Sequence, residues 1–189
     1  MLYFVAIVAP DWMNEQVLVW KNYMRSTYGC QVALRSPAHI TLVPPFSMKP
    51  EREGDISFHL QKFAATEKNF QVHVKNFDAF RPRVIFLDVE PTEGLMLLKQ
   101  QLDQYIQTLS TFSFKPEQRP FHPHVTIANR DLKKKDFQPA WDYFNHIKYV
   151  ANFPASGISL LRHNNAIWEI AGSFPLAEAP GPAGYLSNG

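Results

Sequence analysis

Two short strings in this sequence place a titratable ring and a hydroxyl at the same spacing: His39-Ile40-Thr41 and His124-Val125-Thr126. Successive side chains of a β-strand point to opposite faces, so the histidine and the threonine of each string share one face. Their Cα atoms are then roughly 6.6 Å apart, which is twice the rise per residue of a strand. Two such strings on facing strands would surround one small tetrahedral anion with two imidazoles and two hydroxyls.

The chemistry expected of these residues is general acid–base catalysis on a phosphate ester. An imidazole has a pKa near neutrality, so one ring can accept a proton while the other donates one. With a cyclic phosphodiester, the neutral histidine would activate water for in-line attack, and the protonated histidine would protonate the departing ribose oxygen. Thr41 and Thr126 would donate hydrogen bonds to the non-bridging oxygens and stabilise their growing charge. This mechanism needs neither a metal nor a cofactor.

A structural interpretation of the same residues competes with the catalytic one. A single histidine on an apolar strand usually bonds a backbone carbonyl and has no catalytic role, and threonine favours strands in any case. However, the two strings share residue types and spacing although they lie far apart in the chain. We therefore expect His39, Thr41, His124 and Thr126 to form a catalytic site. Because the strings are nearly equivalent, the sequence leaves open which histidine is the base and which the acid.

Three residues near the strings are candidates for binding the substrate. Arg35 precedes the first string and Arg130 follows the second, and either guanidinium could bind a phosphate through two hydrogen bonds. Arg130 is the preferred candidate, because it leaves the motif strand at its end and could overhang a cleft. Phe46 follows the first string and could stack on a base. The alternatives are solvated surface charges for the arginines and core packing for the phenylalanine.

A metal site is a further hypothesis, because His122 and His124 form a His-x-His pair. Two ligands on one strand face are common in zinc and iron sites, but at least one more protein ligand is required. The remaining histidines lie at unrelated spacings, and no carboxylate stands at a ligand-like offset. We therefore expect no metal, with His122 supporting the site or facing solvent.

Composition narrows the class of protein. The chain has 189 residues, of which 46% are hydrophobic, enough for a sizeable core. A net charge of +2 excludes a histone-like mode of nucleic-acid binding. The single cysteine, Cys30, excludes an intramolecular disulfide framework and fits a reducing compartment. The apolar segment 2–8 lacks the basic start of a signal peptide and no apolar run reaches membrane-spanning length, so we expect a cytoplasmic protein.

The hydrophobic pattern predicts a mixture of strands and helices around the two strings. Strands are expected at 2–8, 32–34, 40–43, 70–75, 83–90, 157–161 and 166–170. Helices are expected after Asp11 up to Gly29, at 55–65, after Thr92 up to Leu109, and more weakly at 133–147. In each half of the chain a helix precedes a proline-containing loop that leads into a motif strand, which suggests duplication. We expect one domain over 1–176 and a disordered tail over 177–189.

The segments Ser36–Leu42 and Phe121–Ala128 resemble the paired motifs of the 2H phosphoesterase superfamily. The likeness is greatest to the RNA 2′,5′-ligase-like, or cyclic nucleotide phosphodiesterase-like, branch. It extends over the opening strand and helix, the segment Phe70–Glu90 and the closing segment Ile158–Phe174. A single His-x-Thr string is a weak match, whereas two in this order are a strong one.

This resemblance implies a bilobal α+β fold in which two antiparallel sheets flank a central cleft and helices pack outside. It implies metal-independent processing of 2′,3′-cyclic phosphates or 2′,5′ linkages, in either the hydrolytic or the ligating direction. The four motif residues carry over as the catalytic set. The expected partner is an RNA terminus or a small cyclic nucleotide, with no membrane and no obligate protein partner evident. The alternative is a non-catalytic module that binds RNA ends.

Overall fold

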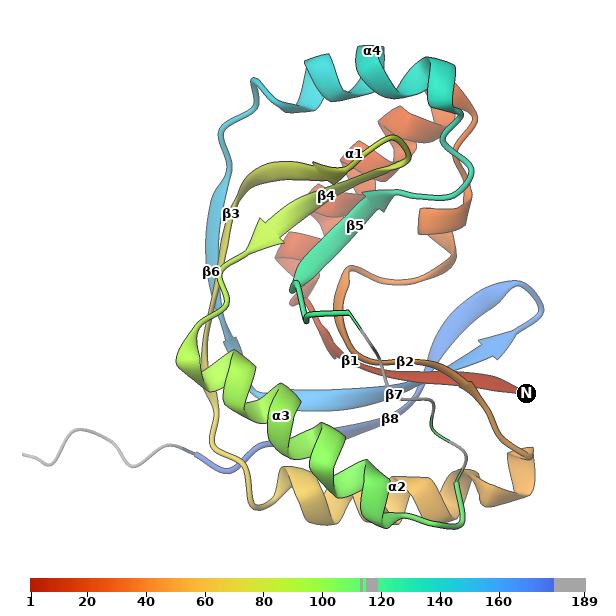
Figure 1. The fold of residues 1–189 in the computed structure, drawn as a ribbon, viewed down its shortest axis with the longest axis vertical. Helices are drawn as coiled ribbons and strands as arrows, with labels where there is room; N and C mark the ends of the chain where they lie inside the picture. Colours follow the sequence, from red (N-terminus) through yellow and green to blue (C-terminus); the bar gives the residue numbers. More distant parts are fainter. Residues whose placement is uncertain (113, 115–118, 179–189) are drawn as a thin grey trace, which may run out of the picture.

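The computed structural model describes residues 1–112, 114 and 119–178. Within these residues it contains eight strands and four α-helices (Figure 1). The strands are β1 (Leu2–Val8), β2 (His39–Ser47), β3 (Phe70–Phe80), β4 (Val84–Val89), β5 (His124–Ala128), β6 (Val150–Ala155), β7 (Gly157–Asn164) and β8 (Ile167–Pro175). The helices are α1 (Asp11–Tyr28), α2 (Glu53–Ala64), α3 (Glu93–Thr108) and α4 (Lys134–Phe144), with short 3₁₀ helices η1 (Val32–Arg35) and η2 (Pro50–Arg52).

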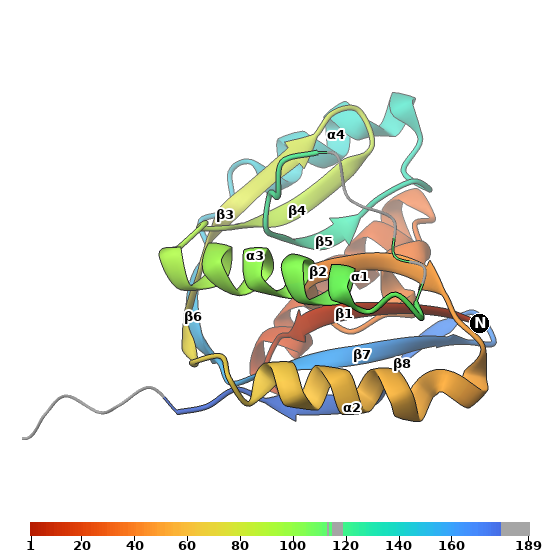
Figure 2. The ribbon, with the colours of Figure 1, turned by 60° about the horizontal axis from the view of Figure 1, so that its bottom comes forward.

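All eight strands belong to one curled sheet in the order β6-β3-β4-β5-β2-β1-β7-β8, and neighbouring strands are antiparallel. The expected α+β class is confirmed. The two expected sheets are two halves of this single sheet, joined where β2 pairs with β5 at Ile40 and Val125. The two strands that carry the histidine motifs, β2 and β5, are therefore neighbours in the middle of the sheet. Figure 2 shows them from a second direction.

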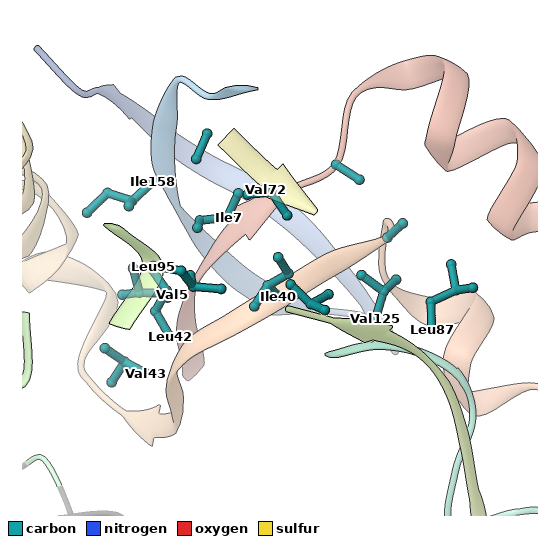
Figure 3. Packing of buried hydrophobic residues seen from close by; sticks show 14 of the residues in the cluster. Val5, Ile7, Ile40, Leu42, Val43, Val72, Leu87, Leu95, Val125 and Ile158 are labelled. Atoms are coloured by element: carbon teal, nitrogen blue, oxygen red, sulfur yellow. The ribbon is translucent and has the colours of Figure 1, made fainter. Parts of the chain in front are cut away.

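The two central strands have a core face and a second face. Ile40 and Leu42 of β2 and Val125 and Ile127 of β5 are at most 1% exposed, and they pack into one cluster with side chains from both halves of the sheet (Figure 3). Each such burial is worth about 1.5–3 kcal/mol. A slip of one residue would turn all four side chains out of the core, so their burial fixes the pairing of the strands. The motif histidines and threonines, which alternate with them, therefore lie on the other face.

The helices pack outside the sheet in two pairs. Tyr23 of α1 stacks on Tyr143 of α4, with 4.1 Å between ring centroids. Phe63 of α2 packs against Tyr105 of α3 at 5.4 Å, and these two helices run side by side in both views (Figures 1 and 2). Helix α1 ends at Gly29, whose φ of 73° is a left-handed conformation that glycine adopts without steric cost. No helix in the described part of the chain is long and apolar enough to cross a membrane.

Three local expectations differ from the structure. The strand expected at 32–34 is wrong, because this segment forms η1. The backbone N–H groups of Gln31 and Val32 both donate to the Asp131 carboxylate, at 2.6 and 2.8 Å, so a distant side chain decides the local conformation. Strand β6 was not predicted, although its side chains alternate between exposed and buried. Thr92 precedes α3 as expected, and a threonine at this position typically caps a helix, but its side chain makes no cap hydrogen bond.

The C-terminal tail is described only in part. Ala177 forms an isolated parallel bridge with Lys68. Residues 179–189 lie outside the described residues, so the disorder expected for them stays a prediction, as does the domain boundary at 176.

Candidate active site

The register of the sheet brings the two motifs together. Ile40 of β2 lies directly opposite Val125 of β5, and the strands run antiparallel. In this antiparallel register His39 lies on the Thr126 side of the Ile40–Val125 pair and Thr41 lies on the His124 side. Directly opposed residues have Cα atoms roughly 4.5–5.5 Å apart. All four side chains lie on the face opposite to the core, two from each of the paired strands.

The two imidazoles are anchored in the same way. His39 Nδ1 lies 2.7 Å from the carbonyl oxygen of Pro37, and His124 Nδ1 lies 2.7 Å from that of His122. A carbonyl only accepts, so Nδ1 carries the hydrogen in both rings. This leaves each Nε2 as the atom available for proton transfer. The similarity between the two motif segments therefore extends to their hydrogen bonds, because each ring donates to the backbone carbonyl two residues earlier.

Aromatic rings surround both histidines and reduce their contact with water. The Phe4 ring lies 4.8 Å from that of His39, while Phe80 and Phe86 lie 5.2 and 4.9 Å from that of His124. Burial lowers the pKa of His39 from 6.5 to about 4, and it also lowers the pKa of His124. Both rings are therefore neutral in the free protein near pH 7.

A cavity of about 620 Å³ opens beside this quartet. Thr41, His124 and Thr126 form part of its wall. Lys99 of α3, Phe80 and Phe121 also line it. A volume of this size accommodates a small organic ligand. The cavity therefore joins three of the four motif residues to aromatic side chains and a cation.

Sequence reasoning missed Lys99, although a signal was present. Lys99 interrupts the apolar stripe of α3, four residues after the buried Leu95. Its ammonium pairs with Asp103 and lies 5.6 Å from the centre of the Phe121 ring. A charge on the apolar face of a predicted helix indicates a side chain held for a specific partner.

The three predicted substrate contacts lie in different places. Phe46 is 6% exposed and packs between Tyr3 and Phe114, which favours the core-packing alternative. Arg35 is exposed and lines a second hollow of about 510 Å³. Arg130 is exposed just beyond β5 and is not among the residues that line either cavity, whereas its neighbour Asn129 is. Their binding roles stay predictions.

His122 contacts a carboxylate. Its Nε2 lies 3.2 Å from Asp88 Oδ1, and its side chain is 48% exposed. Within the described ranges, no group of three or more histidine, cysteine, aspartate or glutamate side chains is arranged to hold a metal ion.

The lowered pKa of His39 leads us to expect that the stability of the protein depends on pH. Between pH 6.5 and about 4 the unfolded chain binds a proton at this residue that the folded chain does not. The free energy of unfolding should therefore fall as the pH drops from 6.5 towards 4. Chemical denaturation at several pH values checks this, with His39→Gln as the comparison. The variant should lose less stability over this interval, and parallel curves for the two proteins would contradict the assignment.

The fold and the paired motifs together define a class of protein, the LigT-like 2H phosphoesterases. The structure is similar to TT0787 of Thermus thermophilus, with a TM-score of 0.69 and 20% identity over 93% of this chain and 98% of that one. It is also similar to E. coli LigT in complex with 3′-AMP, with a TM-score of 0.62 and 20% identity over 92% and 97%. At this level of identity the likeness concerns the fold.

The family model of the 2′-5′ RNA ligase superfamily matches residues 14–166, and the chain belongs to this superfamily. Two Bacillus proteins named "Putative phosphoesterase" are relatives. The one from B. pumilus is 32% identical over 146 residues, or 69% of this chain and 81% of its own length. The match to the B. licheniformis protein, 33% identical over 111 residues, covers 58% of this chain and only 62% of that relative. A Thermotoga maritima protein named RNA 2′,3′-cyclic phosphodiesterase is 29% identical over 130 residues, covering 66% and 67%.

Proposed function

We propose that this protein is a phosphoesterase that opens 2′,3′-cyclic phosphates at RNA ends or on small nucleotides. One observation carries the proposal: the pairing of β2 with β5 sets two equivalently anchored imidazoles and two threonines on one face, at the edge of a cavity. The names of the Thermotoga relative and of the LigT complex with 3′-AMP support a nucleotide substrate.

The proposed reaction transfers two protons around one phosphorus atom. One histidine Nε2 takes a proton from water, and the water oxygen forms a bond to phosphorus. The bond from phosphorus to one ribose oxygen breaks, and the other histidine Nε2 gives that oxygen a proton. The hydroxyls of Thr41 and Thr126 donate hydrogen bonds to the two non-bridging oxygens, where charge grows in the transition state. The product is a 2′- or 3′-phosphomonoester.

The cavity supports a nucleoside as the remainder of the substrate. Phe80 and Phe121 line it and offer apolar faces to a base, and the Lys99 ammonium offers a charge to a phosphate. Joining RNA ends through a 2′,5′ linkage would use the same residues in reverse. Water at its bulk concentration favours hydrolysis.

Product analysis tests this proposal directly. The purified protein should convert adenosine 2′,3′-cyclic phosphate, and an oligonucleotide ending in a cyclic phosphate, to phosphomonoesters with undiminished rate in EDTA. Phosphorus NMR distinguishes the 2′-phosphate from the 3′-phosphate. A His39→Ala preparation, purified in parallel, controls for a contaminating enzyme. Tight binding without turnover would favour the RNA-end-binding module instead, and activity that EDTA abolishes and a metal restores would overturn the metal-free mechanism.

A further inference from the structure

A buried cation on helix α1 has a single hydrogen-bond partner. Lys21 is 4% exposed, and its Nζ donates to the carbonyl oxygen of Ser36 at 3.0 Å. Among the described residues the ammonium makes no other hydrogen bond and pairs with no carboxylate. Burial lowers the pKa of Lys21 from 10.5 to about 8. Lysines are seldom buried without a counter-charge, because an unpaired charge away from water is costly. The ammonium therefore has donors left for an anion.

The hollow of about 510 Å³ that Arg35 lines lies beside this ammonium. Its walls come from α1, from the segment 34–37 that leads into β2, and from the start of β8, and Lys21 is part of this lining. In the described part of the chain, the hollow shares no lining residue with the catalytic cavity. It still borders the first motif, since Pro37 lines it and the Pro37 carbonyl accepts the hydrogen bond from His39 Nδ1.

Three further side chains in the hollow carry donors that suit a phosphate. Asn14 Oδ1 accepts the backbone N–H of Ala38 at 2.6 Å, which leaves the Nδ2 amide of Asn14 for another acceptor. Half-buried Ser36 contributes a hydroxyl and exposed Arg35 a guanidinium. Together with Lys21 they supply two cations and two neutral donors, a set that matches the several acceptor oxygens of a phosphate group. The hollow therefore has the donors of an anion site.

The remaining lining indicates what else the ligand carries. A phosphate ion alone would fill only a small part of 510 Å³, a volume typical of sites for small organic molecules. Half-buried Trp168 offers an aromatic surface to a base. The exposed carboxylates of Asp11 and Glu15 accept hydrogen bonds from hydroxyl and amino groups. They also repel a ligand with several phosphates, so the lining favours one phosphate on a nucleoside.

We propose that this hollow is a second nucleotide site, which binds a nucleoside monophosphate with its phosphate on Lys21 and its base against Trp168. Asn14 and Ser36 donate to the phosphate, and the two carboxylates accept from the nucleoside. The site is separate from the catalytic quartet and requires no turnover, so it goes beyond the proposed function and does not depend on it.

NMR titration of the ¹⁵N-labelled protein with adenosine 5′-monophosphate follows the two sites separately. The indole N–H of Trp168, identified by its loss in Trp168→Phe, reports on the hollow, and the backbone amide of Thr126 reports on the catalytic cavity. The indole signal should shift and saturate. At this signal adenosine, which lacks the phosphate, should bind at least about tenfold more weakly, because it makes no hydrogen bond to the ammonium. Inorganic phosphate, which lacks the base, should also bind about tenfold more weakly.

Lys21→Met removes the ammonium and keeps an unbranched side chain. In this variant the difference between the nucleotide and adenosine at the indole signal should be lost, while the nucleotide still shifts the Thr126 amide. The matched control is Lys62→Met, at an exposed lysine of α2 that lines neither cavity, and it should retain the difference.

Thermal unfolding separates a binding role of Lys21 from a purely structural one. In phosphate-free buffer Lys21→Met should unfold at the same temperature as the wild type or at a higher one, because it removes an unpaired buried charge. If Lys21 only tied the segment 34–37 to α1, the variant would unfold at a lower temperature and would still bind the nucleotide more tightly than adenosine.

Other outcomes would also overturn the proposal. Equal affinities for the nucleotide and adenosine at the indole signal of the wild type would exclude the phosphate site, and equal affinities for the nucleotide and inorganic phosphate would exclude the role of Trp168. A titration that moved only the Thr126 amide would show that the nucleotide binds in the catalytic cavity alone. These wild-type comparisons need no substitution at Lys21, so they decide the proposal even if Lys21→Met fails to fold.

Discussion

Replacing His39 or His124 by alanine should lower kcat on a nucleoside 2′,3′-cyclic phosphate by about 10²–10⁴-fold, since each substitution removes one of two proton transfers. Each Nε2 is the ring atom left for the reaction, because Nδ1 is held by a carbonyl at 2.7 Å in both cases. The loss should appear in kcat more than in KM, because the proton moves in the transition state. Steady-state kinetics with the two single variants measures both parameters.

The double variant sharpens this prediction. Two groups that act in one transition state are strongly non-additive, so His39→Ala with His124→Ala should lose less activity than the product of the single losses. The exposed His146, beyond α4, lines neither cavity and provides a matched control. His146→Ala should retain the wild-type rate. Strictly multiplicative losses in the double variant would indicate that the two rings act in separate steps.

Thr41→Val and Thr126→Val should each reduce kcat by about 10²–10³-fold, the usual cost of removing one donor to a developing oxyanion. Valine keeps the shape and the strand preference of threonine and removes only the hydroxyl. Both threonines share a face with the two imidazoles and line the cavity, so each hydroxyl should contact a non-bridging oxygen of the bound phosphate. Kinetics and thermal unfolding of both variants check the prediction.

Restoring the hydroxyl tests the chemistry rather than the packing. Thr41→Ser and Thr126→Ser should recover most of the lost activity, because serine keeps the donor. Thr27→Val, at an exposed position near the end of α1, should behave as the wild type. If valine and serine at position 41 gave equal rates, the hydroxyl would have no part in stabilising the transition state.

Much of the local structure could be predicted from short-range pattern. Strand β1 matches its predicted bounds of 2–8, and α3 follows Thr92 as its apolar stripe indicates. The predictions are wrong where a residue distant in the sequence determines the local conformation or the packing. The segment 32–35 is a 3₁₀ helix whose start is held by Asp131, about a hundred positions later, which accepts the N–H groups of Gln31 and Val32. Phe46 lies on the strand that carries the first motif, yet it packs with Tyr3 and Phe114.

The sequence alone determined that the histidine and the threonine of each motif would share one face of their own strand, because alternation along a strand is a property of the local backbone. Only the tertiary structure decided that β2 and β5 are neighbours, with Ile40 opposite Val125. It also decided that Asp88 of β4 would lie directly opposite His124. These placements depend on burial and pairing between segments far apart in the chain, and the periodicity of a single segment holds no information about its partner.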